Sequence, residues 1–313
     1  MVKLFWGLLR AARPRQWIKN VALFAGLVFA GQLDNTTSVV LITKAFFLFC
    51  GFSSAVYLLN DVFDIERDKQ HPIKSQRPIA SGQVPIPLVI SIVIGLIIIL
   101  LPLAYLTSPS LFYAGLAYLL LQLLYSAYFK SVILLDVMVI AAGFVLRVYA
   151  GIWAIDAHLN VWFLLSIISF SLFLAIGKRR SELTLMAQKD IAAKHRETLL
   201  HYPEALLDIL TSMFANSAWL TYALFAFQQS PVTLRHNILG LFDIGSLPIN
   251  EAKYMMITVP LVIYGVMRYL YVIYEKKEGE SPEKVLLTDT PLLSSVILWL
   301  ILVVIIIYYL GNY

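Results

Sequence analysis

Apolar runs long enough to cross a lipid bilayer occupy most of this sequence. Of its 313 residues, 60% are hydrophobic, whereas a soluble domain of this length is about half apolar. A membrane-spanning helix needs about 20 apolar residues, with a range of about 17 to 25. By this criterion the sequence predicts an all-α integral membrane protein with about nine transmembrane helices. The predicted spans cover residues 17–33, 40–60, 86–106, 110–128, 132–155, 161–176, 206–228, 254–274 and 292–310.

The domain organisation follows from the lack of any long polar region. No low-complexity segment or second, soluble domain is evident, so we expect residues 1–313 to form a single transmembrane domain. The two longest polar connections, residues 67–85 and 178–203, are long enough to fold over a site as a cap. The single cysteine, Cys50, cannot form an intramolecular disulfide. The basic segment Arg10–Lys19 leads into an apolar run without a small-residue cleavage site, so we expect the first helix to be retained.

Positive charge is distributed unevenly between the connections. With about nine spans the termini lie on opposite sides, and most cations fall on the side of the N-terminus. Cytoplasmic loops carry such an excess, so we predict a multi-pass protein of the plasma membrane with a cytoplasmic N-terminus. The net charge of +5 reflects this asymmetry and does not indicate a nucleic-acid partner. The cations on the predicted cytoplasmic side are Arg10, Arg13, Arg15, Lys19, Arg67, Lys69, Lys74, Arg77, Lys130, Lys178, Arg179, Arg180, Lys189, Lys194, Arg196, Lys276, Lys277 and Lys284.

A cluster of acidic residues follows the second predicted span, on the same side. If the helix continues, Asp61, Asp64 and Asp68 fall at i, i+3 and i+7 and share a face with Asn60. Carboxylates at this spacing repel one another, so a positive partner is required. Mg²⁺ is the natural candidate, because it takes oxygen ligands and completes its shell with water and substrate phosphates. The alternative is a solvated, mixed-charge loop.

Several cations near this cluster are candidates for binding substrate phosphates. Arginine can bind phosphate oxygens in a fork, and lysine supplies a point charge. The candidates are Lys19, Arg67, Lys74, Arg77, Lys130, Lys178 and Arg179. Glu182 lies four residues after Lys178, where it could orient that cation or bind metal. The alternative is that these cations only obey the positive-inside bias.

Charged residues inside the fifth predicted span are further candidates. Asp136 and Arg147 lie about 16 Å apart along a helix and on nearly the same face. Intramembrane charges are costly and usually face a cavity or a partner, so each either contacts substrate or forms a structural ion pair. Tyr125 and Tyr128 close the fourth span and either contact substrate or anchor the helix at the interface. We expect Gly143 and Gly151 to permit close helix packing.

The order Asn60-Asp61-x-x-Asp64-x-x-x-Asp68 resembles the signature of the UbiA superfamily of intramembrane prenyltransferases. The resemblance implies nine helices around a lateral, lipid-open cavity, with Mg²⁺-diphosphate bound at its cytoplasmic end. Within the superfamily the chain is similar to the branch that makes decaprenyl-phosphate phosphoribose. Other members resemble one another in a second aspartate-rich motif after the sixth span, and here that place is basic. The likeness runs through residues 13–20, 71–82, 135–147, 178–182 and 282–289.

The resemblance implies 5-phosphoribosyl 1-diphosphate as donor, a polyprenyl phosphate as acceptor and diphosphate as leaving group. We expect Asn60, Asp61, Asp64 and Asp68 to hold Mg²⁺-diphosphate, with Asp61, Asp64 and Lys130 catalytic. The acceptor phosphate is already anionic, so the reaction needs no general base. In this family the product usually serves as a cell-wall arabinose precursor.

Two other functions remain open at this point. One is a UbiA-type transfer of a polyprenyl group from its diphosphate to an aromatic or glycerol-phosphate acceptor. The other is a transporter or lipid-binding scaffold, since intramembrane charge also marks transport pathways. The sequence predicts neither the prenyl chain length nor the oligomeric state.

Overall fold

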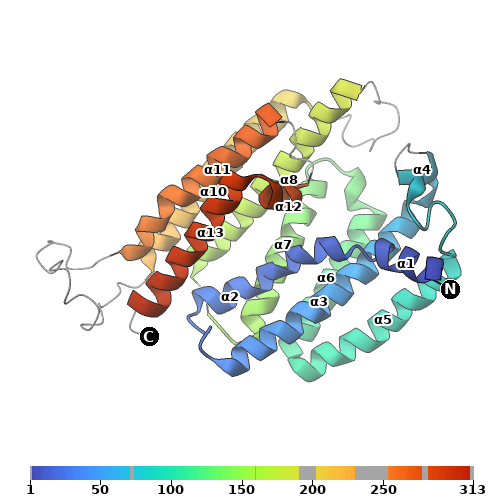
Figure 1. The fold of residues 1–313 in the computed structure, drawn as a ribbon, viewed down its shortest axis with the longest axis horizontal. Helices are drawn as coiled ribbons and strands as arrows, with labels where there is room; N and C mark the ends of the chain where they lie inside the picture. The colour runs from blue at the N-terminus through green and yellow to red at the C-terminus, as the bar shows by residue number, and fades with distance from the viewer. Residues whose placement is uncertain are drawn as a thin grey trace, which may run out of the picture. The chain divides into compact units, whose positions relative to one another are not determined.

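A computed structural model gives the structure of the protein and describes residues 2–70, 74–158, 160–189, 202–229, 253–276 and 281–310. In these ranges every regular element is a helix, which confirms the predicted all-α class (Figure 1). The α-helices are α1 (Val2–Ala11), α2 (Phe24–Phe29), α3 (Thr36–Phe63), α4 (Ile65–Gln70), α5 (Ile86–Thr107), α6 (Pro109–Ala127), α7 (Leu135–Ala154), α8 (Val161–Lys189), α10 (Glu204–Gln228), α11 (Val259–Tyr271), α12 (Pro282–Thr288) and α13 (Thr290–Val304). Shorter 3₁₀ segments are η1 (Pro14–Leu23), η2 (Lys74–Gln76), η3 (Phe129–Ser131) and η7 (Tyr254–Thr258), and π-helical turns are η8 (Val272–Lys276) and η9 (Ile305–Leu310).

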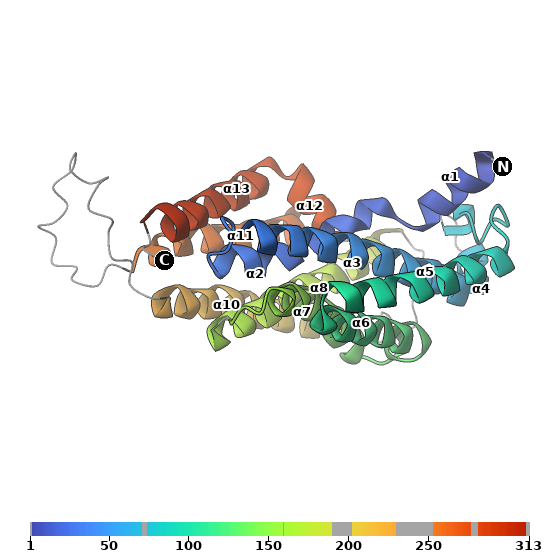
Figure 2. The ribbon, with the colours of Figure 1, turned by 90° about the horizontal axis from the view of Figure 1, so that it is seen from below.

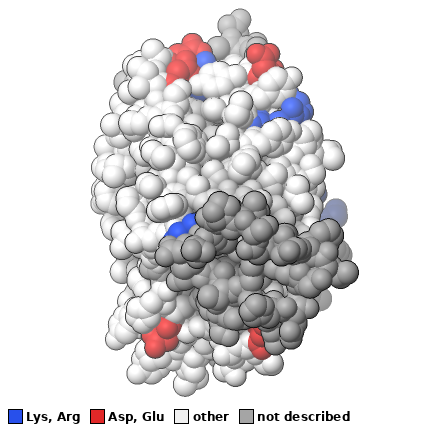
Figure 3. All heavy atoms as spheres, turned by 90° about the vertical axis from the view of Figure 1, so that its left-hand side faces the viewer, with Lys and Arg blue, Asp and Glu red and all other residues white. Residues whose placement is uncertain are grey.

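Within the described ranges, 8 helical segments are long and apolar enough to cross a membrane. They correspond to the second through ninth predicted spans, with α11 extended by η7 and η8 and α13 extended by η9. Many apolar side chains on these helices are exposed, as at Ile98 (65%) and Leu106 (81%) of α5. In Figure 3 most of the surface that is not grey is free of Lys, Arg, Asp and Glu, which form a few separate patches. These features fit a surface that faces lipid tails.

The first predicted span is not an α-helix throughout. Residues 17–33 fall mostly in η1 and α2, which follow one another directly, and they are not among the 8 segments named above. The side chains of Trp17 and Asn20 in η1 bond to α3. Trp17 Nε1 donates to Ser54 Oγ at 3.0 Å, and Asn20 Nδ2 donates to Cys50 Sγ at 3.4 Å. The predicted count of nine spans is therefore not confirmed.

The chain divides into two compact units. The first comprises residues 1–27, 32–158 and 183–204, and the second comprises residues 28–31, 159–182 and 205–313. The single-domain prediction is not tested by this division.

Helices α3, α5, α6 and α7 form the body of the first unit, with α3 packed along α5 and α6 along α7 (Figures 1 and 2). The helix α3 begins at the cap residue Asn35, whose side chain accepts hydrogen bonds from the backbone of Thr37 and Ser38. Gly151 of α7 lies against the backbone of η1, and a Cβ atom there would lie 2.0 Å from the carbonyl oxygen of Leu23. The predicted packing role of Gly151 is thereby confirmed.

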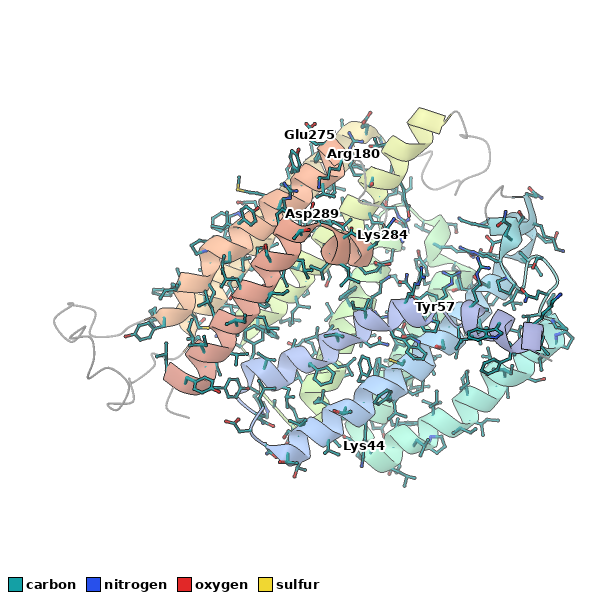
Figure 4. The ribbon with its side chains drawn as sticks, in the orientation of Figure 1. Lys44, Tyr57, Arg180, Glu275, Lys284 and Asp289 are labelled. Atoms are coloured by element: carbon teal, nitrogen blue, oxygen red, sulfur yellow. The ribbon has the colours of Figure 1, made fainter. Side chains whose placement is uncertain are left out.

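The second unit is built on α8, α10, α11 and α13. Its core includes Phe173 from α8, Ala215 from α10 and Tyr269 from α11. Asp289 joins α12 to α13, and Figure 4 labels it at this junction. Its Oδ1 atom accepts hydrogen bonds from Arg268 Nε at 2.9 Å and from the backbone of Leu292 at 3.1 Å, so Asp289 both caps α13 and ties it to α11.

Candidate active site

The acidic motif lies where α3 ends. Asn60 and Asp61 belong to the last turn of α3, Asp64 is its C-cap, and Asp68 lies in α4. The backbone N–H groups of Asp64 and Asp68 still donate to the carbonyl oxygens of Asn60 and Asp64, at 2.9 and 2.8 Å. The motif thus occupies two helices joined at Asp64, so the helix considered from the sequence does not continue unbroken through Asp68. Asp61 and Asp68 are only 2% and 4% exposed.

Cations of the chain itself neutralise these carboxylates. Arg77 Nη1 lies 3.2 Å from Asp61 Oδ1 and 2.6 Å from Asp68 Oδ2, so one guanidinium nitrogen serves both. Lys130 Nζ lies 2.7 Å from Asp64 Oδ1. Arg13 forms a second ion pair with Asp61. The positive partner that the spacing of the aspartates requires is therefore present as protein side chains.

The oxygen donors of the motif fit a divalent ion only in part. In the described residues no three acidic, histidine or cysteine side chains converge as a metal centre. Asp61 and Asp68 do converge, because both contact Arg77 Nη1. Two carboxylates suit Mg²⁺, which typically takes one or two protein carboxylates and completes its shell with water and phosphate oxygens. The donor set is compatible with Mg²⁺ held jointly by protein and substrate.

A polar cavity of about 310 Å³ adjoins the motif. Its wall includes four cations, Arg10, Arg13, Lys74 and Arg77, and the carboxylate of Asp61. The guanidinium of Arg13 also stacks on Tyr57, 5.0 Å from the ring centroid, and Figure 4 labels Tyr57 on α3. This excess of positive charge suits a polyanionic ligand.

Arg10 and Arg13 were not among the predicted site residues. The signal in the sequence was weak, because basic residues before a first span also serve as topology signals. What places Arg13 at the site is the docking of η1 on α3 through Trp17 and Asn20, which no local pattern indicates.

A second cavity, of about 180 Å³, lies between α3, α5 and α6. Its wall is apolar except for Gln122 and Ser126. Ser126 Oγ donates a 3.2 Å hydrogen bond to Asn60 Oδ1, so this cavity reaches the acidic motif. Its lining suits a hydrocarbon chain and not a diphosphate.

Arg147 is buried among neutral groups of the first unit. Its guanidinium donates to Asn20 Oδ1 at 2.9 Å, to Tyr118 Oη at 2.7 Å and to the carbonyl oxygen of Gly143 at 2.9 Å. The guanidinium also lies 4.8 Å from the centroid of the Tyr118 ring. Arg147 pairs with no carboxylate in the described part of the chain, which corrects the structural ion pair considered from the sequence. The predicted contact with substrate stays a prediction.

Asp136 is also buried and bonds to a residue that sequence reasoning missed. Tyr202 Oη donates to Asp136 Oδ1 at 2.7 Å and accepts a 2.7 Å hydrogen bond from the backbone N–H of Leu134. Tyr202 stands just before α10, at the end of the second long polar connection, and nothing in its sequence context marked it. Residues 190–201 of that connection lie outside the described residues.

Four other predicted residues are not drawn into the polar cavity. Arg67 is exposed on α4 and Tyr128 is exposed at the end of α6, while Lys19 of η1 and Tyr125 of α6 are partly buried. None of them is among the residues that line the cavity. Their substrate-binding roles remain untested.

The basic cluster of the second unit is a connected set of side chains on α8. Lys178 Nζ lies 3.7 Å from Glu182 Oε1, and Arg179 Nη1 lies 2.5 Å from Glu182 Oε2. Glu182 thus orients Lys178, which is one of the two roles predicted for it. It orients Arg179 as well. Arg180, labelled in Figure 4, pairs instead with Asp208 of α10 at 2.5 Å.

Comparison with protein families adds an independent observation. Residues 20–287 match the model of the UbiA prenyltransferase family. The chain belongs to this family. The match includes the acidic motif, the apolar cavity and the basic cluster of α8, whereas Arg10 and Arg13 of the polar cavity lie before it. The family resemblance drawn from the sequence is confirmed.

Two relatives of this UbiA-family protein are similar over nearly the whole chain. One is decaprenyl-phosphate phosphoribosyltransferase of Corynebacterium glutamicum, 32% identical over 306 residues, which are 96% of this chain and 87% of the relative. The other is the enzyme of the same name from Mycolicibacterium smegmatis, 33% identical over 298 residues, which are 94% and 90% of the two chains.

The fold is also that of a solved UbiA structure. A UbiA homolog from Archaeoglobus fulgidus bound to GPP and Mg²⁺ superposes with a TM-score of 0.68, covering 96% of this chain and 99% of the homolog at 20% identity. At this identity the likeness concerns the fold alone.

Proposed function

We propose that this protein transfers 5-phosphoribose from 5-phosphoribosyl 1-diphosphate to a polyprenyl phosphate in the membrane and releases diphosphate. The observation that carries the proposal is the polar cavity beside the acidic motif, whose wall holds Arg10, Arg13, Lys74 and Arg77. The names of the two relatives support the same reaction. We place the cavity on the cytoplasmic side, from the distribution of positive charge along the sequence.

The charge of the site matches a donor with phosphate groups at both ends. Arg10, Arg13, Lys74 and Arg77 line the cavity, and Lys130 contacts the motif from a separate turn. Arg13, Arg77 and Lys130 contact the three carboxylates of the motif, and Arg10 and Lys74 add two further cations to the cavity wall, where phosphate oxygens can bind. A polyprenyl diphosphate carries its charge at one end only and needs a smaller excess.

The bond changes follow from the substrates. An oxygen of the acceptor phosphate attacks C1′ of the ribose, and the bond from C1′ to the diphosphate oxygen breaks with its electron pair leaving on the diphosphate. The attacking oxygen is anionic, so no side chain has to remove a proton. Catalysis then consists of positioning two anions and stabilising the charge that develops on the leaving group.

Each part of the site has a role in this reaction. Asp61 and Asp68, with Asp64 and Asn60, would hold Mg²⁺ together with the donor diphosphate. Mg²⁺ supplies Lewis-acid stabilisation of the leaving group when bound. Arg13 and Arg77 orient the diphosphate and keep the two buried carboxylates neutralised, and Lys130 neutralises charge near Asp64. Lys178 and Arg179, held by Glu182, bind the 5-phosphate or the acceptor phosphate.

The test uses purified protein in detergent with ribose-labelled donor and a polyprenyl phosphate. Lipid-extractable label that requires Mg²⁺ is the expected result. The opposite outcome is turnover of a polyprenyl diphosphate with an aromatic acceptor and no label in the lipid, which would assign the protein to ordinary prenyl transfer. Turnover of either kind excludes a transporter or scaffold.

A further inference from the structure

The turn between α6 and α7 has an unusual backbone conformation at Leu134. This residue has φ 67° and ψ −39° and directly precedes α7. Residues other than glycine rarely adopt positive φ values, and such a conformation persists only where the surrounding structure holds it. The contacts that hold this turn therefore also fix the position of the side chains that the turn carries.

Two buried side chains hold this turn. The backbone N–H of Leu134 donates to Tyr202 Oη at 2.7 Å, and Tyr202 Oη donates to Asp136 Oδ1 at 2.7 Å. Asp136 is 1% exposed and Tyr202 is 4% exposed. A buried hydroxyl that bonds on both sides has a fixed position, since losing either bond leaves a polar group unsatisfied.

The same turn carries Lys130. Its ammonium contacts Asp64, the cap residue of α3, and only three residues separate Lys130 from Leu134. The backbone of η3 is tied to the end of α6, since Ser131 N–H donates to the carbonyl oxygen of Tyr128 at 3.1 Å. Lys130 is thus anchored on one side by α6 and on the other by the turn that Tyr202 holds.

We propose that Tyr202 and Asp136 are positioning residues that fix the Leu134 turn and thereby set where Lys130 meets Asp64. The consequence for catalysis rests on the proposed function, in which Lys130 neutralises charge on the donor. A displacement of about 1 Å in such a group can cost up to about 100-fold in rate. Tyr202 also ends the second long polar connection, so this contact links that connection to the acidic motif.

The first test is independent of activity. Tyr202→Phe removes only the hydroxyl and is compared with wild type by hydrogen exchange over residues 129–137 and by the reactivity of Lys130 toward acetic anhydride. We expect several-fold faster exchange at this turn and faster acetylation of Lys130. Unchanged exchange and unchanged acetylation would overturn the proposal, even if the protein transfers no phosphoribose and the proposed function fails.

The second test is a double-mutant cycle on the rate of phosphoribosyl transfer. Tyr202→Phe is expected to lower kcat by about 10- to 100-fold in the wild-type background. In the Lys130→Met background the same change should alter kcat by less than about twofold, because the residue it acts through is absent. An equal loss in both backgrounds would overturn the proposal.

Two further variants separate positioning from general stability. Tyr222→Phe removes another buried hydroxyl, which bonds Thr258 at 2.6 Å and Trp299 at 2.8 Å in the second unit. It should match Tyr202→Phe in thermal stability but leave kcat and Lys130 acetylation unchanged. Asp136→Asn keeps an oxygen that accepts from Tyr202 and should restore most of the activity that Asp136→Ala loses. A loss of kcat in Tyr222→Phe as large as that in Tyr202→Phe would contradict the positioning role. A loss of kcat in Asp136→Asn as large as that in Asp136→Ala would also contradict it.

Discussion

Lys130 Nζ lies 2.7 Å from Asp64 Oδ1, although the two residues are 66 positions apart in the chain. The contact joins the turn after α6 to the end of α3, and both side chains are mostly buried. An ion pair in such a place is screened less by solvent than a surface pair. The ion pair joins Lys130, which was predicted from the sequence to bind substrate phosphate, to Asp64, the central aspartate of the acidic motif.

Asp64→Asn should nearly abolish transfer while the protein stays folded. The change keeps the size of the side chain and removes the charge that faces Lys130, so we expect kcat to fall by about 100- to 1000-fold. Transfer of labelled phosphoribose measures the effect. Glu66→Gln is the matched control, because Glu66 is 78% exposed and pairs only with Lys69 among the described residues. Full activity of Asp64→Asn with normal Mg²⁺ dependence would remove the metal and catalytic roles of Asp64.

Arg13→Gln should weaken use of the donor. Arg13 lines the polar cavity and pairs with Asp61, so its loss removes a phosphate contact and leaves a buried carboxylate with less compensation. We expect kcat/KM for the donor to fall by about 10- to 100-fold. Arg15→Gln is the control two residues away, since Arg15 is exposed and does not line the cavity. Equal effects of the two substitutions would mean that Arg13 contributes only to the general positive charge.

The membrane helices and the acidic motif could be predicted because both depend on local pattern. A run of about 20 apolar residues suffices to predict a span, and eight of the predicted spans have helical counterparts. The first predicted span remains unconfirmed, because residues 17–33 fall mostly in the 3₁₀ segment η1 and the short helix α2. The contacts of Trp17 and Asn20 with α3 are tertiary and could not be predicted from local pattern.

Long-range contacts also account for the residues that were missed at the site. Arg13 and Tyr202 reach their partners across 48 and 66 residues. The sequence placed Arg77 and Lys130 on the same side of the membrane as the motif. It could not show that Arg77 forms ion pairs with two carboxylates of the motif and that Lys130 forms one with the third.

Arg147→Met should destabilise the protein more than it impairs the chemistry. The change leaves Tyr118 and Asn20 without their guanidinium donor inside the helical bundle, and we expect a loss of about 1–3 kcal/mol in the free energy of unfolding. Thermal unfolding in detergent measures it, with kcat determined per folded molecule. Lys44→Met is the control, because Lys44 is exposed on α3 (Figure 4). Normal stability with lost donor binding would instead support a direct contact of Arg147 with substrate.

Asp289→Asn should lower stability at neutral pH but not in strong acid. Hydrogen bonds from Arg268, with those from Lys276 and the backbone of Leu292, hold the pKa of the Asp289 carboxyl well below its usual range. Because the folded pKa is depressed, the contribution is present above the unfolded pKa of about 4 and is lost as the pH falls below it toward the folded pKa.

We expect Asp289→Asn to cost about 1–2 kcal/mol at pH 7, a modest value because Arg268 and Lys276 are partly exposed. The difference from wild type should shrink below about pH 4. Thermal unfolding as a function of pH measures both. Asp34→Asn, at an exposed loop position, should show neither effect. A difference that stays constant from neutral to strongly acidic pH would show that the charge of Asp289 does not stabilise the fold.

The central claim is that the 5-phosphoribosyl group moves to the lipid and that the diphosphate of the donor is released. The most direct measurement uses 5-phosphoribosyl 1-diphosphate labelled with ¹⁴C in the ribose and with ³²P in the β-phosphate, incubated with the protein, a polyprenyl phosphate and Mg²⁺. We predict that ¹⁴C enters the lipid phase while ³²P stays in the aqueous phase as diphosphate. Entry of ³²P into the lipid, or retention of both labels in the aqueous phase while a polyprenyl diphosphate is consumed, would contradict the account.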